Sequence, residues 1–370
     1  MGREAPGSAS GRRSDDTIER VIVSTIRVIE LAIPLISPFR NAATTLVDRR
    51  VVLIEVHDDG GAVGWGEAAP FPGATEDDID TVWDSLTAGE VDSFSPSAHA
   101  AYDEGCNDAA ARTAGLPLWR RLGVVEKQPI TASLAVGIEG DVQETLAAVA
   151  AAIDAGYRAI KLKIAPERIS LVEAVRRAFP DLAFGVDGNG SFRPDEAEQL
   201  VTLDEWCLLY LEQPFAAGAL AASSALRRRI ELPVVLDEDI VSSSSAVAVV
   251  EAGAADVVTV KPGRLGVDGA LAVFDVVATE ADVRVKISGL IETGIGRGHA
   301  LALAMSDGVV FSDLAPAQAF LENDIVDRPW MIQDGMIGAR SEPGIGVEPD
   351  PVMLARYLVR ETVVDLSGDR

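Results

Sequence analysis

Five stretches in the middle of the chain decide its fold: AIKLKIA (159–165), AFGVDGNG (183–190), CLLYLEQP (207–214), PVVLDED (233–239) and DVVTVKPGRLG (256–266). Each is a nearly continuous apolar run that ends in polar residues with Gly or Pro, as expected of parallel strands covered on both faces. The pattern recurs at ITASLAVGI (130–138), VRVKISGLIETG (283–294) and GVVFSDLAP (308–316). Landmark positions 163, 187, 212, 237, 261, 288 and 312 are 24 to 27 residues apart, the length of one strand, loop and helix. The spacing predicts a TIM-like barrel of eight strands.

The sequence before and after these repeats does not follow the alternation of strands and helices. Residues 21–36 and 50–66 are β-branched runs, and Asp58-Asp59-Gly60-Gly61 inside the second predicts an antiparallel hairpin. Residues 76–88 and 97–115 have helical periodicity. We therefore predict four parts: a disordered lead-in (1–20), an α+β domain (21–125), the barrel (126–319) and a C-terminal segment that returns to the α+β domain (320–370).

Composition narrows the class of protein. The chain has 370 residues, a formal net charge of -26 and two cysteines, Cys106 and Cys207. Two cysteines exclude a disulfide scaffold and fit a reducing cytoplasm, and Cys207, at the head of an apolar run, is expected to be a small buried hydrophobe. The acidity argues against nucleic-acid and membrane partners, because it repels phosphate backbones and anionic lipids. No stretch predicts a transmembrane helix or a secretory signal, so we expect a cytoplasmic protein, whose oligomeric state the sequence leaves open.

Three successive candidate strands end in a carboxylate. Asp187, Glu212 and Asp237 follow one another at intervals of 25 residues. The carboxyl ends of barrel strands form one rim, where active sites are built, so we expect these side chains to lie side by side. Any one of them could simply cap a helix, but three adjacent negative charges repel unless a cation lies between them. All-oxygen ligation favours Mg²⁺, with Mn²⁺ as a substitute, over zinc, which normally recruits His or Cys.

Lysine is rare in this chain, and its placement is therefore informative. Only five of the 32 basic residues are Lys, and four of them lie in apolar strands. Lys161 and Lys163 share one face of a strand, because residues two apart point the same way, and Lys261 comes from the opposite wall. These amines could merely neutralise the carboxylates. In the functional interpretation, Lys163 and Lys261 flank a bound molecule and exchange a proton next to its carboxylate, whose enolate the metal stabilises.

The combination K-x-K, D-x-N, E-Q-P, D-E and K-P, in that order, resembles the muconate lactonizing enzyme subgroup of the enolase superfamily over about residues 21–360. The resemblance implies a modified (β/α)7β TIM-like barrel with an α+β capping domain built from the N-terminal part and the C-terminal tail. It also implies magnesium ligands at Asp187, Glu212 and Asp237, an acid/base pair of Lys163 and Lys261, and a cationic Lys161 that tunes Lys163.

Within that subgroup, SGLIETGIGR (288–297) and FSDL (311–314) are similar to o-succinylbenzoate synthases and to the related N-succinylamino acid racemases. This similarity implies a small carboxylate substrate, 2-succinyl-6-hydroxy-2,4-cyclohexadiene-1-carboxylate, and a carbon-oxygen lyase of menaquinone biosynthesis. The candidate substrate contacts are Arg40, Ser133, Asn189, Ser288, Gly289 and Glu292. Arg40 is interpreted either as a solvated loop residue or as a bidentate clamp on the succinyl carboxylate.

Several alternatives stay open at this point. N-succinylamino acid racemization uses the same residues, with Lys163 and Lys261 on opposite faces of one carbon. The motif SPFR (37–40) also resembles dipeptide epimerases, although their pair of aspartates on the last strand is reduced here to Asp313. A Schiff-base aldolase using Lys261 would leave the three carboxylates unexplained. A barrel that only binds or scaffolds would give no reason to retain lysines in strands.

Overall fold

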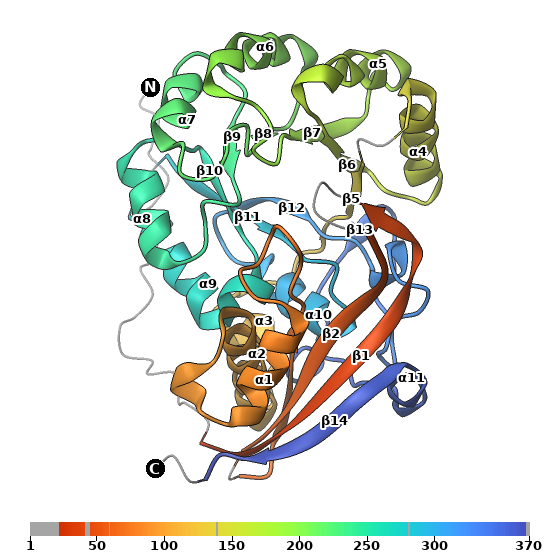
Figure 1. The fold of residues 1–370 in the computed structure, drawn as a ribbon, viewed down its shortest axis with the longest axis vertical. Coiled ribbons are helices and arrows are strands. Elements are labelled where there is room, and N and C mark those ends of the chain that lie inside the picture. Colours follow the sequence, from red (N-terminus) through yellow and green to blue (C-terminus); the bar gives the residue numbers. More distant parts are fainter. Residues whose placement is uncertain (1–21, 41–44, 59, 138–139, 280–281, 368–370) are drawn as a thin grey trace, which may run out of the picture.

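The architecture comes from a computed structural model, which describes residues 22–40, 45–58, 60–137, 140–279 and 282–367; the predicted lead-in (1–20) lies outside these ranges. Eight parallel strands form one sheet in the order β12-β11-β10-β9-β8-β7-β6-β5. The sheet curls until its two ends meet, where the Ser133 amide donates to the Leu314 carbonyl at 3.2 Å. This is the upper half of the molecule in Figure 1.

Strands and helices alternate along the barrel, with one helix after each of the first seven strands. In chain order they are β5 (Ser133–Val136), α4 (Val142–Asp154), β6 (Ala159–Lys163), α5 (Ser170–Ala178), β7 (Ala183–Asp187), α6 (Ala197–Val201), β8 (Leu211–Glu212), α7 (Leu220–Arg227), β9 (Val234–Leu236), α8 (Ser243–Glu251), β10 (Val257–Val260), α9 (Pro262–Ala278), β11 (Arg284–Ser288), α10 (Gly294–Leu303) and β12 (Val309–Asp313). The modified (β/α)7β barrel is thus confirmed.

Local sequence signals set several of the helix starts. Asp141 and Glu144 form a reciprocal capping box at the start of α4, and Ser242 caps α8. Pro262 is the first residue of α9, where its missing N–H costs no hydrogen bond. Because each helix begins soon after a strand, the polar residues at the strand ends are held in short, well-defined turns.

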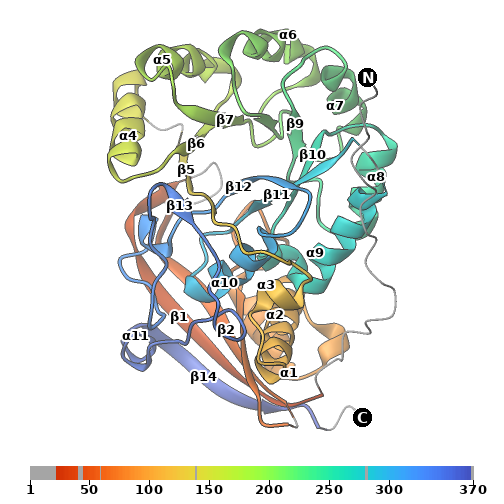
Figure 2. The same ribbon diagram turned by 180° about the vertical axis from the view of Figure 1, so that it is seen from behind.

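An antiparallel sheet in the order β14-β1-β2-β3 forms the capping domain. Its strands are β1 (Val23–Arg40), β2 (Thr45–Asp58), β3 (Val63–Ala68) and β14 (Leu358–Asp365), and its helices are α1 (Ile79–Ala88), α2 (Pro96–Thr113) and α3 (Leu118–Arg121). The predicted hairpin joins β2 to β3, with the Asp58 amide donating to the Ala62 carbonyl at 3.0 Å. The C-terminal strand β14 pairs with β1, so the tail completes the cap as predicted (Figure 2).

The rest of the C-terminal segment runs along the barrel and the cap. It contains the short strand β13 (Met336–Ile337), which pairs with β4 (Ile130–Thr131), and the helix α11 (Pro351–Tyr357). The larger hydrophobic core includes the barrel strands and their helices and continues into the capping sheet through residues such as Ile29 and Leu53. A second core lies between the capping sheet, α1 and α2. Within the described ranges, no helix has both the length and the apolar character needed to cross a bilayer.

The expectation that Cys207 is buried is wrong. Cys207 is exposed, and it ends a short 3-10 helix (Thr202–Trp206) with a left-handed φ of 50°. The apolar run CLLYLEQP begins as this turn, and the strand itself covers only its later residues, Leu211–Glu212. Hydrophobic content alone did not distinguish the turn from the strand that follows it.

Candidate active site

The residues predicted to act in catalysis and metal binding lie at the carboxyl ends of barrel strands. Lys163 ends β6 and pairs in register with Asp187, which ends β7 and in turn pairs with Glu212 at the end of β8. Asp237 directly follows β9, and Lys261 lies between β10 and α9. All but Lys163 are at most 7% exposed. The fold therefore brings these side chains to one end of the barrel.

Lys161 and Lys163 share Asp187. The Lys161 ammonium lies 3.1 Å from Asp187 Oδ2 and 3.0 Å from Glu212 Oε2, so it bridges two carboxylates. The Lys163 ammonium lies 2.9 Å from the same Asp187 oxygen and also donates to Asn189 Oδ1. Of the two side chains, Lys163 is 28% exposed and Lys161 is 7% exposed. Lys163 is thus the lysine that a molecule entering the site can reach.

The opposite wall carries a separate ion pair. Lys261 Nζ lies 2.6 Å from Asp237 Oδ2, and Arg264 Nη1 donates to the Asp237 carbonyl at 2.9 Å. Arg264 Nε also donates to the Ala74 carbonyl, at 3.2 Å, in a loop of the capping domain. Asp237 is therefore held by cations, and one of them ties the barrel rim to the cap.

These contacts decide the charge states of the buried groups. Burial alone would raise the pKa of Asp187, but Lys163 and Lys161 outweigh it and hold that pKa well below its usual range. Burial likewise opposes ionisation of Asp237, and Lys261 with Arg264 lowers its pKa below the usual range. Burial lowers the pKa of Lys161, but Asp313, Glu212 and Asp187 together raise it well above the ordinary value. These three carboxylates thus favour the charged form of Lys161.

Three residues that sequence reasoning did not assign complete the interior. Lys286 on β11 donates to Glu212 Oε2 at 2.5 Å, and its ammonium lies 2.5 Å from Asp313 Oδ2 on β12. The Tyr210 hydroxyl donates to Asp313 Oδ1 at 2.8 Å. The sequence offered two signals. Lysine is scarce, and Lys286 is one of the four that lie in apolar runs. Tyr210 comes two residues before Glu212 in the apolar run that ends at this carboxylate.

The three strand-end carboxylates are ligands of the type that a hard divalent cation prefers. Asp187, Glu212 and Asp237 offer only oxygen donors, which Mg²⁺ prefers. In the part of the chain that the structure describes, however, no three Asp, Glu, His or Cys side chains already surround a common point as a metal cage. Lysine ammonium groups hold these carboxylates instead. The donor set therefore fits a magnesium ion that takes over charge now supplied by lysine.

Of the residues predicted to contact substrate, some contact the lysine and carboxylate cluster and others lie elsewhere. Asn189 links Lys163 to Glu238 Oε1, which its amide reaches at 2.9 Å. Ser133 Oγ donates to Asp313 Oδ1 at 3.4 Å, across the closure of the barrel. Ser288 is buried at the end of β11, beside β12. The side chain of Arg40, the last residue of β1, lies outside the described part of the structure.

Glu292 and Gly289 form a tight turn rather than a part of the lysine and carboxylate cluster. Glu292 accepts from the Leu290 amide at 2.7 Å and from Arg297 Nη2 at 2.9 Å. A Cβ on Gly289 would lie 2.5 Å from Glu292 Oε2, so a larger residue there would displace the Glu292 carboxylate. Glu292 thus binds its own loop and α10.

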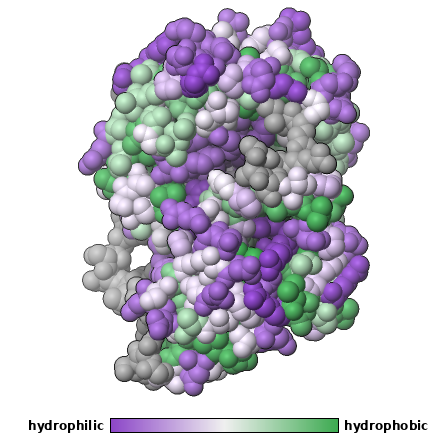
Figure 3. Space-filling model, viewed as in Figure 1, coloured by the Kyte–Doolittle hydropathy of each residue, from purple (hydrophilic) through white to green (hydrophobic). Residues whose placement is uncertain are grey.

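Arg49 joins the cap to the rim of the barrel. It is buried and donates to carbonyls on both sides, at 2.5 Å to Ala69 of the cap and at 3.0 Å to Leu290 of the barrel. A cavity of about 410 Å³ lies nearby between the two domains. It is lined by cap residues 73–76 and by rim residues that include Asn189, Gln213, Glu238 and Arg264. Hydrophilic residues gather in the recess between the barrel and the cap on the face drawn in Figure 3.

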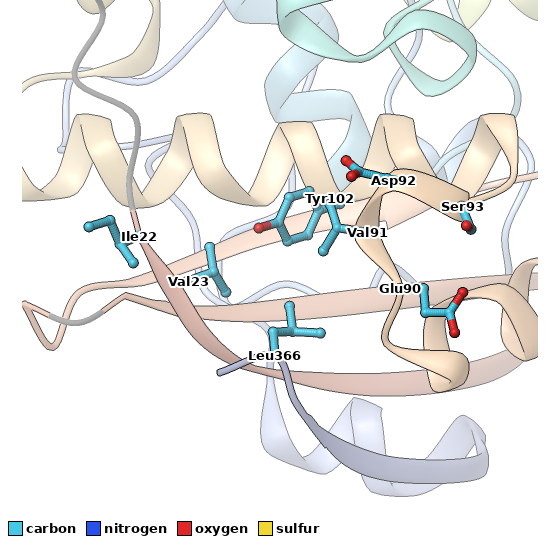
Figure 4. A pocket seen from close by; sticks show the side chains of 8 residues that line it. All are labelled: Ile22, Val23, Glu90, Val91, Asp92, Ser93, Tyr102 and Leu366. Carbon is cyan, nitrogen blue, oxygen red and sulfur yellow. The ribbon is translucent and has the colours of Figure 1, made fainter. Parts of the chain in front are cut away.

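A second cavity, of about 510 Å³, lies at the far end of the capping domain (Figure 4). Its walls are apolar side chains such as Val23 and Leu366, with Glu90 and Asp92 beside them. Its lining includes no residue of the barrel rim, whereas Gln213 and Glu238, which line the first cavity, directly follow Glu212 and Asp237. The cavity beside the barrel rim is therefore the better candidate for substrate binding.

Comparison with known proteins agrees with this arrangement. The family model described as "Enolase C-terminal domain-like" matches residues 144–353, and that of the "Mandelate racemase / muconate lactonizing enzyme, N-terminal domain" matches residues 23–93. The chain is 30% identical to an o-succinylbenzoate synthase of Geobacillus kaustophilus over 88% of this chain and 93% of that protein. It is 35% identical to an N-succinylamino acid racemase of Thermus thermophilus over 68% of this chain and 69% of that protein. The crystal structure of an enolase superfamily member from Listeria innocua superposes with a TM-score of 0.85 at 27% identity, covering 94% of this chain and all of that one.

Proposed function

This chain belongs to the enolase superfamily, with the domains of the mandelate racemase and muconate lactonizing enzyme family, and from that premise we propose that it is an o-succinylbenzoate synthase. The reaction would dehydrate 2-succinyl-6-hydroxy-2,4-cyclohexadiene-1-carboxylate, a step of menaquinone biosynthesis. The observation that carries the proposal is the pair of lysines, Lys163 and Lys261, held by carboxylates on different strands at one end of the barrel. Relatives with that name, about 30% identical to this chain, support the choice of substrate.

Lys163 is the base in this proposal. Its side chain is more exposed than those of Lys161 and Lys261. The neutral amine of Lys163 would take the proton on the ring carbon that carries the carboxylate. The resulting ammonium would return that proton to the departing hydroxide on the neighbouring carbon. Water leaves and the ring becomes aromatic, so no other acid is required.

Asp187, Glu212 and Asp237 would hold a magnesium ion. The ion supplies positive charge that stabilises the negative charge developing on the substrate carboxylate. Lys163 and Lys261 now form ion pairs with Asp187 and Asp237, and a competing cation at these carboxylates would release the amines. Lys161, held between Glu212, Asp187 and Asp313, would remain a fixed positive charge beside Lys163.

A second candidate function is N-succinylamino acid racemase, and the placement of Lys163 and Lys261 on opposite walls of the barrel favours it. Lys163 belongs to β6 and Lys261 follows β10, so two different walls each present one amine. Racemization needs one base on each face of a carbon, whereas the dehydration needs only Lys163 as a base. Relatives named N-succinylamino acid racemase, at 31% and 35% identity, support this candidate.

Two other activities fit the contacts less well. Dipeptide epimerases are expected to carry two aspartates on the last strand, whereas this chain has only Asp313 there, and its oxygens already contact Tyr210, Lys161 and Lys286. A Schiff-base aldolase using Lys261 would leave the three strand-end carboxylates, Asp187, Glu212 and Asp237, without a role. We therefore rank both below the synthase and the racemase.

The test uses purified protein stripped of metal with a chelator. We expect no activity before addition of Mg²⁺ or Mn²⁺, then dehydration of the cyclohexadiene acid, followed by its product absorbance. Parallel samples contain an N-succinyl amino acid or L-Ala-L-Glu in deuterated buffer, and deuterium at the α-carbon is measured by NMR. Efficient racemization without dehydration would make the racemase the function, and turnover in excess chelator would exclude the metal-dependent reaction.

A further inference from the structure

Beneath the substrate site, four buried side chains form a closed ring of alternating charge. Lys161 lies 3.0 Å from Glu212 Oε2 and 3.1 Å from Asp313 Oδ2. Lys286 lies 2.5 Å from each of the same two oxygens. The four residues come from β6, β8, β11 and β12, so the ring crosses the barrel interior. Their side chains are between 0 and 7% exposed.

Neighbouring groups hold this ring in one geometry. Thr259 donates to Glu212 Oε1 at 2.9 Å, so contacts occupy both oxygens of Glu212. The Tyr210 hydroxyl fixes Asp313, and its ring lies under the Lys286 ammonium, with Nζ 4.6 Å from the ring centroid. The Tyr210 ring fits because residue 185 is glycine: a Cβ there would lie 2.4 Å from it.

We propose that Lys286 and Asp313 are positioning residues that set the charge and orientation of Glu212 and thereby the affinity of the site for its divalent metal. The proposal rests on the proposed function, in which Glu212 is a metal ligand. Two ammonium groups and two carboxylates cancel within the ring, so the pair of Lys286 and Asp313 adds no net charge. Each member alone, however, places a full charge beside Glu212 or beside Lys161 in a region with little water to screen it.

The ring also reaches the base. Lys161 belongs to the ring and at the same time lies 3.1 Å from Asp187, the carboxylate that holds Lys163. Without Lys286, Lys161 would be the one remaining ring cation for both Glu212 and Asp313. It would be drawn toward them and away from Asp187. The ring thus links Lys286, which no substrate touches in the proposed reaction, to the placement of Lys163.

If Lys286 and Asp313 act through their charges, replacing one should strengthen Mg²⁺ binding and replacing the other should weaken it. A merely structural role does not predict opposite changes. Lys286→Met removes a positive charge next to Glu212, so Mg²⁺ should bind about tenfold more tightly. Asp313→Asn leaves the ring with an excess positive charge, so Mg²⁺ should bind about tenfold more weakly. The double variant Lys286→Met/Asp313→Asn restores neutrality and should bind Mg²⁺ within about twofold of the wild type.

The experiment is isothermal titration of Mg²⁺ alone into the metal-stripped full-length protein and the three variants, at one pH and ionic strength. Lys127→Met, which removes an exposed lysine that contacts Ser341, is the matched control and should bind as the wild type does. Opposite shifts in the single variants, cancelled in the double variant, support the proposal. Weaker binding in both single variants, or a double variant whose affinity does not return to that of the wild type, would overturn it.

Two further outcomes are separable from these. If the wild type binds no Mg²⁺, the proposed metal-dependent function fails, and this inference fails with it. If the wild type binds Mg²⁺ but the variants do not shift in opposite directions, the inference alone fails. If Lys286→Met does not fold, the comparison of Asp313→Asn with the double variant still tests the inference. Only the charge ring predicts that adding Lys286→Met to Asp313→Asn restores the affinity for Mg²⁺.

Discussion

Lys286 Nζ lies 2.5 Å from Asp313 Oδ2, between adjacent barrel strands, and their side chains are 0% and 5% exposed. Asp313 is the single aspartate left, on the last strand, of the pair expected in dipeptide epimerases. Its Oδ2 is in contact with two lysines of the chain itself, Lys286 and Lys161. A buried pair of this kind is costly to break from one side, because the remaining charge has no partner.

Lys163→Arg should lower the rate of the catalysed reaction by at least about a hundredfold, because arginine keeps the charge but does not act as a base near neutral pH. The measurement is kcat for dehydration at saturating Mg²⁺, with Lys127→Arg as the surface control. Lys161→Arg tests the assignment within the pair. Near-normal activity in Lys163→Arg together with an inactive Lys161→Arg would show that the other lysine is the base.

Lys261→Arg should damage racemization of an N-succinyl amino acid more than it damages dehydration of the cyclohexadiene acid. The reason is that racemization requires Lys261 to exchange a proton, whereas dehydration requires only its positive charge. Both rates are measured on the same preparation, in deuterated buffer for the racemization. Equal losses would contradict these separate roles, and normal racemization would remove Lys261 from the acid/base pair.

Gly185→Ala should reduce the free energy of unfolding by about 1–3 kcal/mol, the usual cost of overpacking a core. An alanine Cβ at this position would lie 2.4 Å from the ring of Tyr210, which has little room to move because its hydroxyl binds Asp313. Gly269→Ala is the control, since its Cβ would meet Leu265 at an ordinary 3.4 Å inside helix α9. Urea unfolding followed by circular dichroism gives both values, and equal stabilities would show that the Tyr210 ring relaxes without cost.

The stability of the protein should fall between pH 5 and pH 8, partly because of Glu67. Burial raises the pKa of Glu67 to about 7, although Thr293 and Gly296 at the start of α10 donate hydrogen bonds to it. A carboxyl group whose pKa is higher in the folded state than in the unfolded state stabilises the fold at low pH. That stabilisation is lost as the pH rises through the folded-state value.

Glu67→Gln should therefore show a smaller loss of stability between pH 5 and pH 8 than the wild type, because an amide does not ionise. Urea unfolding at pH 5, 6, 7 and 8 measures this slope. Glu173→Gln, on the outer surface of α5, is the control and should leave the slope unchanged. A slope in Glu67→Gln as steep as in the wild type would assign the pH dependence to other buried carboxyl groups.

The sequence by itself determined the barrel, because a repeat of 24 to 27 residues and apolar runs that end in polar residues depend on local chain geometry. It also placed Asp187 and Glu212 at strand ends, and Lys161 and Lys163 on one face of a strand, since position along a strand fixes which end of the barrel a side chain reaches. The length of strand β8 and the exposure of Cys207 were not determined in this way, because a left-handed turn and a strand can share the same apolar composition.

The tertiary structure alone decided which charges meet inside the barrel. Lys286 and Glu212 are 74 residues apart in the chain and lie on strands that are not neighbours in the sheet, so no local pattern connects them. Their contact arises because a closed barrel directs side chains from opposite walls into one small volume, where each buried charge must find a partner. The same closure brings Asp313 of the last strand into contact with Lys286 and Lys161, which the motif of that strand did not predict.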